Sequence, residues 1–393
     1  MIRFIPDKQL EGVITNASKK KNADLELNTE VFRGIKEGLA QRGASAHESI
    51  MSPWGSEIAE GILKKYPADS TSNRIVPQQS FAIQVAGDYK IKSLEPDLNA
   101  FLTSESNDNI ERKITALKSL LKMASDNSVI QQAGKILSDD TAPVALKKRV
   151  AATLGESPGP EVNKVLTEVK KAPPDLEAAI ATALAGSTEG KKIVFDQVRN
   201  GSFRSRTLTD PHVEERILLN ISPKQQQEYN SLIANVEPID SERQALIDER
   251  LKSFKDFKPS TAQLDSGSRV FYANCNACHQ KYTLSGIGPQ LHGIGKRGAD
   301  AIAEKIIDPN RNITEAFRNY TIKLKDGKVL TGLYRRDEGA VVIFGDLSGK
   351  EVSIPKKNIA EQKPSRYTIM PDHFGSTLSQ REFNNLLAYL LTW

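Results

Sequence analysis

The sequence predicts a mainly α-helical protein whose C-terminal third carries a small insert of β-strands. From about residue 109 to residue 220, apolar residues recur at spacings of three and four, which is typical of helices that bury one face. Proline and glycine interrupt this pattern at a regular interval. Between about residues 319 and 362, short apolar runs alternate with turn residues, which is typical of strands.

Length and composition indicate an ordinary soluble protein of two or three domains. The chain has 393 residues, of which 38% are hydrophobic and 26% are charged. The net charge of +5 is small and spread along the chain, and no basic patch interleaved with aromatic residues argues for a nucleic-acid partner. No apolar run approaches the roughly 18 residues of a membrane helix. We therefore expect no transmembrane segment in this chain.

Residues 1–108 are the least defined part, a helical N-terminal region. The segments 32–40 and 57–66 have the spacing of amphipathic helices. Trp54 stands between a proline and a glycine, so we expect it to lie in a turn and to anchor that turn by packing. Met51 is expected at the surface of a polar loop.

A fixed period marks the helical stretch from 109 to 220. Pro143 and Pro174 are 31 residues apart, and so are Gly155 and Gly186. A period of this length predicts paired helices that stack on their neighbours, because no pair buries its apolar face alone. We therefore expect a HEAT-like α-solenoid, which either presents a concave partner-binding surface or spaces the flanking domains.

Residues 221–260 are charged and helical in pattern, and they predict a connecting helix followed by a linker. An apolar stripe along this segment is narrow, because it contains only Leu246, Ile247 and Leu251. The charged side chains beside the stripe are expected to face solvent: Glu242, Arg243, Glu249, Arg250 and Lys252. A further domain is expected over residues 261–393.

The segment from Cys275 to His279 reads Cys-Asn-Ala-Cys-His. Two thiols separated by two residues, with a histidine directly after the second, form the pattern for covalent attachment of haem c. A short helical turn lets both thiols reach the vinyl groups while the imidazole turns under the iron. The chain has two cysteines, so a four-thiolate zinc site within one chain is excluded. A disulfide or a plain thiol pair is the alternative.

The two axial ligands of such a haem are predicted from the residues downstream. His279 is the fifth ligand, and Met370, which precedes Pro371 and the amphipathic run 383–391, is the candidate for the sixth. His292 and His373 are competing candidates. The carbonyl of Pro289 is free to accept the Nδ1–H of His279, which would fix the tautomer and orient the ring.

A close helix contact is predicted beside the motif. Gly267 and Phe271 lie four residues apart on the helix that leads into Cys275. The small glycine would allow a second helix to approach, and Phe271 would fill the groove. That second helix is expected to be the last one, which contains the apolar residues Phe383, Leu387, Tyr389 and Leu390.

Five short strands are expected between the two axial candidates, at about residues 319–362. They span residues 320–324, 329–335, 340–344, 351–354 and 358–361. Asp326-Gly327 and Ser348-Gly349 supply hairpin turns. This number of short strands predicts a small SH3-like barrel, which covers the haem edge, docks a partner or braces the domain.

Together these residues resemble the PVC-type haem-binding domain, a cytochrome c family interrupted by a β insert. The resemblance covers about a third of the chain, and the segment 242–247 and the helical part also resemble what precedes that domain. It implies a class I-like cytochrome c fold with the β insert. The matching residues are Gly267, Phe271, Cys275, Cys278, His279, Gly288, Pro289, Gly293, Arg297, Asp308, Pro309, Tyr320, Asp326, Gly327, Gly332, Ile359, Met370, Pro371, Leu378, Leu387, Ala388, Tyr389 and Leu390.

The function expected from these residues is electron transfer by one covalent haem c. Ligation by His279 and Met370 leaves no open site on the iron, so we expect an electron carrier and not an enzyme. The partners would be a donor dehydrogenase, acting on carbohydrate by resemblance, and a downstream acceptor. One alternative is a helical-repeat scaffold or redox sensor in which the haem is a reporter. Another is a peroxidase-like haem with a labile Met370.

The expected location is the periplasm or another extracytoplasmic compartment, because bacteria attach haem c outside the cytoplasm. Residues 1–7 carry no apolar signal segment. We therefore expect this chain to be part of a longer exported protein. The resemblance also associates the domain with an upstream dehydrogenase-like β-propeller, which is not visible in this sequence, so no enzymatic activity is carried over.

Overall fold

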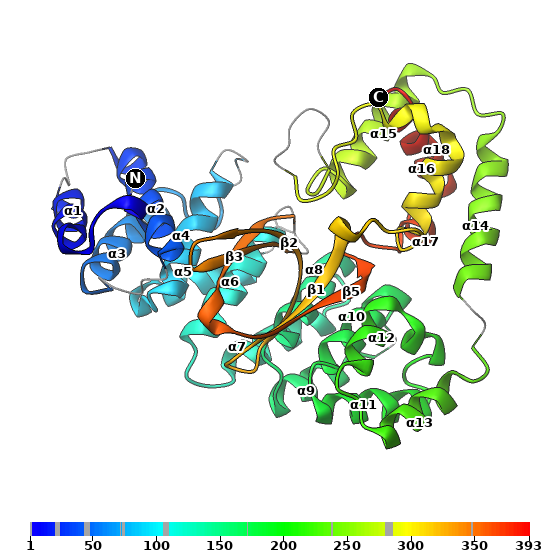
Figure 1. Cartoon of the computed structure of the whole chain (residues 1–393), viewed down its shortest axis with the longest axis horizontal. Coiled ribbons are helices and arrows are strands. Elements are labelled where there is room, and N and C mark those ends of the chain that lie inside the picture. The colour runs from blue at the N-terminus through cyan, green and yellow to red at the C-terminus, as the bar shows by residue number, and fades with distance from the viewer. Residues whose placement is uncertain are drawn as a thin grey trace. The chain divides into compact units, whose positions relative to one another are not determined.

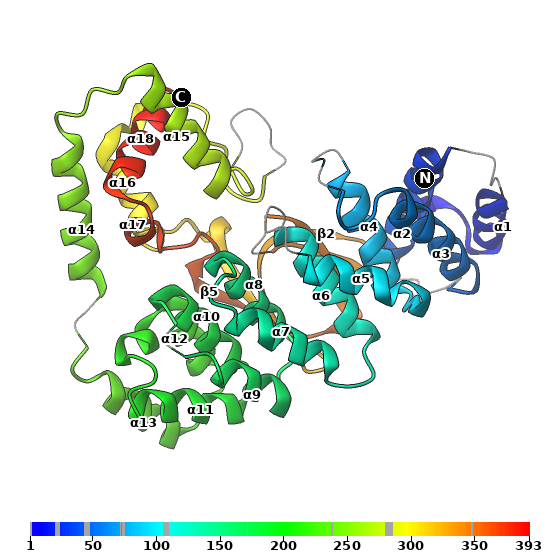
Figure 2. The same ribbon diagram turned by 180° about the vertical axis from the view of Figure 1, so that it is seen from behind.

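The computed structural model describes residues 2–19, 24–42, 48–70, 72, 75–104, 110–170, 172–236, 239–279, 286–346 and 349–393. It divides into two compact units, the first formed by residues 1–203 with 338–341, the second by residues 204–337 with 342–393. The chain is mainly helical, with one small antiparallel sheet of five strands in its C-terminal part (Figures 1 and 2). The predicted mixture of helices and a small sheet is therefore confirmed.

The N-terminal stretch of the first unit consists of packed helices. Trp54 and Met51 are both buried within α3, so the prediction of a turn at Trp54 and of a surface loop at Met51 is wrong. The Trp54 ring packs edge-on against Phe32, with centroids 5.1 Å apart, and its Nε1–H donates to Asn28 Oδ1 over 3.0 Å. These tertiary contacts outweigh the local preference of a proline for a turn. The helices are α1 Asp7–Lys19, α2 Leu25–Gln41, α3 Glu48–Lys65, α4 Val76–Asp88 and α5 Glu95–Thr103.

The rest of the first unit is a stack of helices that contact their neighbours. Helices α4, α6, α8 and α10 are successive neighbours in one row, and α7 contacts α9 in another. A Cβ added to Gly155 at the end of α8 would lie 2.7 Å from the Cα of Ala183 in α10, so this glycine permits the close approach. The pairing of helices is confirmed, whereas the HEAT-like assignment stays a prediction. The helices are α6 Ile110–Met123, α7 Ser128–Ser138, α8 Val144–Gly155, α9 Pro160–Thr167, α10 Pro174–Leu184 and α11 Thr188–Arg199.

The second unit has a helical core built from α14, α15, α16, α17 and α18. Phe271, Ile306, Phe383 and Leu387 are central to it, and Ile247 of α14 is buried in the same cluster. The helices are α12 Pro211–Leu218, α13 Pro223–Ile233, α14 Ile239–Phe254, α15 Thr261–Asn274, α16 Gly298–Ile307, α17 Phe374–Thr377 and α18 Gln380–Leu391. Short 3-10 turns of this unit are η3 Ser205–Thr209, η4 Ile294–Arg297, η5 Glu315–Phe317 and η6 Lys356–Asn358.

Two charged residues of α14 are not where the sequence places them. Glu242, Glu249 and Lys252 are exposed as expected. The Arg250 residue is only 8% exposed and the Arg243 side chain only 15%. The prediction that these two arginines face solvent is therefore wrong, because both are bonded to the segment that follows Met370.

Close approach of α15 and α18 is confirmed. A Cβ on Gly267 would collide with the backbone of Asn385, lying 2.6 Å from its carbonyl carbon, and would lie 2.8 Å from Tyr389 Cβ. Ser260 and Ser379 begin the two helices with capping boxes, in which the serine side chain and the residue at N3 satisfy each other's backbone amides. Local capping thus defines where each helix starts, and Gly267 defines how closely they cross.

The sheet has the strand order β4-β3-β2-β1-β5. Its strands are β1 Arg318–Leu324, β2 Val329–Glu338, β3 Val341–Gly345, β4 Glu351–Pro355 and β5 Ile359–Thr368. Gly327 and Gly349 have left-handed φ values of +90° and +83°, which suit the predicted turns, while Ser348 lies outside the described residues. Five strands are confirmed, whereas closure into an SH3-like barrel stays a prediction.

Helix α12 braces the sheet at three successive residues. Glu214 accepts from Arg366 over 2.6 Å and from the Tyr367 hydroxyl. Glu215 accepts from Thr321 over 3.2 Å, and Arg216 donates to the Val329 carbonyl over 3.0 Å. The strands are therefore held to the helices of the same unit by side chains as well as by their own ladder.

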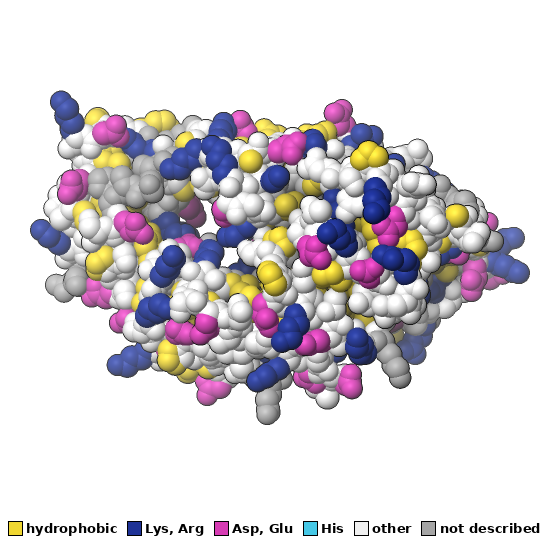
Figure 3. All heavy atoms as spheres, turned by 90° about the horizontal axis from the view of Figure 1, so that it is seen from below, with side chains coloured by type: hydrophobic (Ala, Val, Ile, Leu, Met, Phe, Trp, Pro, Cys, Tyr) yellow, Lys and Arg dark blue, Asp and Glu magenta, His cyan; other side chains and the backbone are white. Residues whose placement is uncertain are grey.

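Charges of both signs are intermingled on the surface. On the face drawn in Figure 3, Lys and Arg side chains alternate with Asp and Glu, and no broad patch of one sign is visible. None of the helices that the structure describes is long and apolar enough to cross a membrane.

Candidate functional site

The cysteine motif forms a compact turn at the C-terminal end of α15. The amide of Cys275 donates to the Phe271 carbonyl over 2.8 Å, which is the last bond of the helix. The amides of Cys278 and His279 then both donate to the Cys275 carbonyl, over 3.1 and 2.9 Å. The turn brings two thiols and one imidazole together within five residues, as the sequence predicts.

Each thiol lies against a different apolar cluster. Cys275 packs on the helical core of α15, α16 and α18, and Cys278 packs on Ile287, Leu333 and Ile369. Both cysteines are free thiols. Burial raises the pKa of Cys275 to about 12, with a smaller effect of the neighbouring Cys278, and burial together with Asp346 raises the pKa of Cys278. Both sulfurs are therefore protonated at neutral pH in the haem-free chain.

These pKa values predict slow alkylation. A pKa raised from 9.0 to about 12 lowers the thiolate fraction of Cys275 at pH 8 by about 10³, and the thiolate is the reactive form. We expect iodoacetamide to modify Cys275 at least about 100-fold more slowly in the folded, haem-free chain than in urea, as followed by peptide mass mapping. Equal rates in the two states would show that the thiol is not buried.

His279 is held in one tautomer. Its Nδ1 lies 2.9 Å from the Pro289 carbonyl oxygen, the hydrogen bond that the sequence predicts. A carbonyl only accepts, so Nδ1 carries the proton and Nε2 presents a lone pair. Burial lowers the pKa of His279, although the bond to Pro289 opposes that shift. The imidazole is therefore neutral, which is the form that binds a metal.

The loop that carries Pro289 fits closely around His279. A Cβ on Gly288 would lie 2.9 Å from Cε1 and 3.0 Å from Nδ1 of the imidazole, so a larger residue would displace the ring. The Gly288 amide donates to the Cys278 carbonyl over 2.9 Å. Arg335 of β2 donates to the carbonyls of Ile287 and Gly286, over 3.2 and 3.3 Å. The β insert thus supports the loop that orients the imidazole.

Met370 follows β5 and is half-buried. Its amide donates to Thr368 Oγ1 over 3.3 Å. The residue before it, Ile369, packs in the same apolar cluster as Ile287 and Cys278. The structure therefore unites Cys275, Cys278, His279 and Pro289 by direct bonds, and it brings in the Met370 segment through Ile369.

The two competing histidines lie on other segments. His292 belongs to the loop that leads into η4. His373 stands at the start of α17, where its ring contacts Phe374 with centroids 4.7 Å apart.

Two features of this site have no clear signal in the sequence. Asn319 is 0% exposed, and neither its amide nitrogen nor its amide oxygen has a hydrogen-bond partner among the described residues. Asn319 is the cross-strand partner of Leu333, which packs in the cluster of Ile287 and Ile369, and so shares the face of Leu333 on the sheet. The second feature is Gly349, where a Cβ would lie 2.7 Å from the Ala277 carbonyl carbon and 3.3 Å from Cys278 Sγ.

These residues fit haem c. The turn offers two neutral thiols and a neutral imidazole, Cys278 packs on the apolar residues Ile287, Leu333 and Ile369, and the buried amide of Asn319 on the same strand pair as Leu333 has no hydrogen-bond partner among the described residues. Among the described residues, no three His, Cys, Asp or Glu side chains gather as ligands for a bare ion. A porphyrin supplies four nitrogen ligands itself, so haem needs only the two axial side chains.

Comparison with other proteins adds no assignment. No protein-family model matches the sequence, and no curated protein matches it. The interpretation of this site therefore depends on its own residues and their geometry.

Proposed function

We propose that this chain is a c-type electron-transfer protein that acts in the periplasm. The observation that carries the proposal is the bond between His279 Nδ1 and the Pro289 carbonyl, placed directly after a Cys-x-x-Cys turn. A thiol pair with a disulfide role has no need for a histidine held in the tautomer whose Nε2 carries the lone pair. Ligation of haem requires that arrangement.

In this proposal Cys275 and Cys278 would hold the cofactor by thioether bonds, and His279 and Met370 would bind its iron. The cofactor supplies a one-electron couple. The Pro289 carbonyl increases the basicity of the imidazole, and the apolar cluster of Ile287, Leu333 and Ile369 keeps water from the Cys278 side. Two protein ligands leave no open position for a substrate, so the role is that of a carrier.

The proposed partners are a dehydrogenase as donor and a second redox protein as acceptor. Ligation by a thioether favours the reduced state, which makes electron delivery from low-potential dehydrogenases downhill. Contacts of this kind are small and transient, typically below about 1,200 Å² in total. A carbohydrate-oxidising donor is what the resemblance to the PVC-type haem-binding domain adds.

The stacked helices favour a second candidate, a scaffold that binds a protein through the helices of residues 109–220. Helices α6, α8 and α10 are successive neighbours, as in proteins that present an extended helical surface. This candidate predicts stable partner binding that depends on residues 109–220. A carrier alone would show only weak binding that does not need those residues.

The test uses the full chain, exported with a signal peptide in cells that contain haem-maturation machinery. We expect a denaturing gel to show peroxidase-staining haem on the unaltered chain and none on Cys275→Ser/Cys278→Ser. Met370→Ala should keep the stain but lower the reduction potential, because the thioether is lost. His292→Ala is the matched control and should change neither. An unaltered chain without stain would overturn the proposal.

A further inference from the structure

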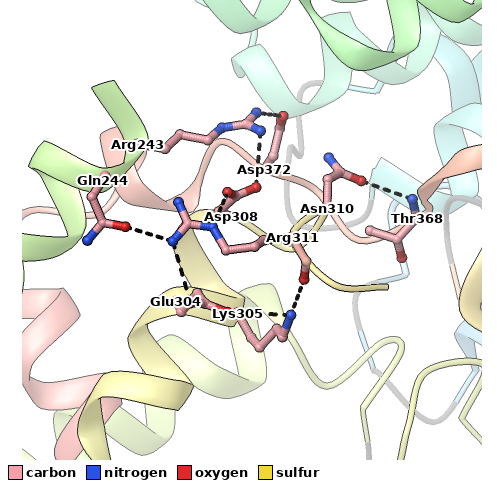
Figure 4. Close-up of polar contacts among 9 residues, drawn as sticks. All are labelled: Arg243, Gln244, Glu304, Lys305, Asp308, Asn310, Arg311, Thr368 and Asp372. Atoms are coloured by element: carbon pink, nitrogen blue, oxygen red, sulfur yellow. Dashed lines mark hydrogen bonds and ion pairs between the residues drawn. The ribbon is translucent and has the colours of Figure 1, made fainter. Parts of the chain in front are cut away.

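Helix α14 is bonded to the segment that follows Met370. Arg243 donates one guanidinium nitrogen to Asp372 and the other to Asp308, the latter over 3.2 Å (Figure 4). The three side chains are 15%, 14% and 4% exposed in the order Arg243, Asp372 and Asp308. Charges buried to this degree need their partners, because unpaired they are costly to remove from water.

The segment before Met370 is held from the other side. The Thr368 amide donates to Asn310 Oδ1 over 3.0 Å. Asn310 belongs to the turn after α16, in which Arg311 Nε donates to Asp308 over 3.0 Å (Figure 4). Thr368 and Asp372 stand two residues before and two residues after Met370. Thr368 is bonded to Asn310, and Asp372 is bonded through Arg243 to Asp308, so both sides of the methionine are fixed to the turn that follows α16.

A second arginine of α14 extends this contact. Arg250 donates to the carbonyls of Gly375 and Leu378, over 2.6 and 2.9 Å, and to Gln380 Oε1 over 3.1 Å. Between the two arginines, Leu246 lies against Gly375, where an added Cβ would be 2.8 Å from its Cδ2. Helix α14 therefore holds residues 372–380 at both ends.

We infer that α14 positions the sixth ligand of the haem, with Arg243 as the positioning residue. This inference rests on the proposed function. A thioether is a neutral, weak ligand. How well it competes with an added ligand therefore depends on how far the chain around Met370 is restrained. Arg243 restrains this chain through its ion pair with Asp372, two residues after Met370. A helix that precedes the cysteine motif thus determines how tightly the iron's sixth position is closed.

The test is a titration of the ferric, haem-bearing full chain with imidazole. Arg243→Gln should bind imidazole about tenfold more tightly and should weaken the far-red absorption band of thioether-ligated ferric haem. Arg243→Lys should lie between Arg243→Gln and the unaltered chain. Glu242→Gln is the matched control, since this neighbour on α14 loses only a surface ion pair to Arg206, with 56% of its own side chain exposed. It should titrate like the unaltered chain.

The outcomes separate the two proposals. Covalent haem on Arg243→Gln, with a native circular-dichroism spectrum and an unchanged imidazole affinity, would overturn this inference and leave the proposed function standing. Absence of covalent haem from the unaltered chain would overturn both. If Arg243→Gln does not fold, Asp372→Ala decides, because it leaves Arg243 paired with Asp308 and removes the acceptor that holds the Met370 segment to Arg243. The same tenfold tightening is expected there, and its absence contradicts the inference.

Discussion

Gly267→Leu is expected to unfold the helical core of the second unit, with a loss of more than about 4 kcal/mol in the free energy of unfolding. Even the Cβ of the new side chain would lie 2.6 Å from the Asn385 carbonyl carbon and 2.8 Å from Tyr389 Cβ. The atoms in the way belong to the backbone of α18, which, unlike a side chain, cannot move aside by changing rotamer. The two helices must separate, and Phe271, Phe383 and Leu387 then lose their common core.

Urea denaturation followed by circular dichroism and tryptophan fluorescence measures this loss. Trp393 is a local reporter, because its ring contacts Phe271 with centroids 4.8 Å apart. Gly34→Leu is the control, since Gly34 lies in α2 with no atom within 4 Å of an added Cβ. It should be neutral or stabilise by up to about 1 kcal/mol, because leucine favours a helix more than glycine. A Gly267→Leu chain that melts like the unaltered one would show that the close crossing is not present.

Arg250→Met is expected to cost about 3 kcal/mol. Methionine keeps the length of the aliphatic stem, but the Gly375 and Leu378 carbonyls lose a charged donor in a buried place. Hydrogen bonds to a charged group contribute about 1.5–3 kcal/mol each, and removal of the buried charge offsets part of that loss. The guanidinium also lies 5.4 Å from the centre of the Phe383 ring, a contact that methionine only partly replaces.

Chemical denaturation gives the total cost, and hydrogen exchange of the amides from 373 to 380 shows where it falls. Arg336→Met is the matched control, because Arg336 pairs with Glu351 at the surface, with side chains 47% and 36% exposed. Such a pair contributes at most about 1 kcal/mol. A loss for Arg250→Met no larger than for Arg336→Met would contradict the structural role assigned to this arginine.

Local chemistry made much of this structure predictable. The turn glycines and short apolar runs predicted five strands because each hairpin is specified by residues close together in the chain. The spacing of Gly267 and Phe271 predicted a close helix contact, because a glycine, which has no side chain, lets the backbone of a second helix approach. Pro289 was predicted as the acceptor for His279 because both belong to one loop. In each case the deciding interaction joins residues close together in the sequence or requires a small residue that the sequence shows.

The burial of Arg243 and Arg250 could not be predicted from the residues near them in the sequence. Helical periodicity finds apolar stripes, and it assigns every arginine beside a stripe to solvent. The acceptors of Arg243, Asp308 and Asp372, follow 65 and 129 residues later. Those of Arg250, the carbonyls of Gly375 and Leu378, follow 125 and 128 residues later. The prediction of a turn at Trp54 was wrong for the same reason, because the partners of this side chain, Phe32 and Asn28, lie on another helix. The burial of Asn319 could not be predicted, because the alternation of apolar and polar residues along a strand assigns a polar residue to the exposed face.

The membership of α14 in the helical core has a consequence for autonomous folding. A polypeptide trimmed to begin at residue 261 would lack Ile247 and would bare the apolar surface that Ile247 covers. It would also leave the carboxylates of Asp308 and Asp372 without the cation from α14. Glu214 and Arg216 of α12 also bond the strands, so a fragment able to hold its shape in isolation must begin near residue 204, where the second unit starts, well upstream of the boundary suggested by the cysteine motif.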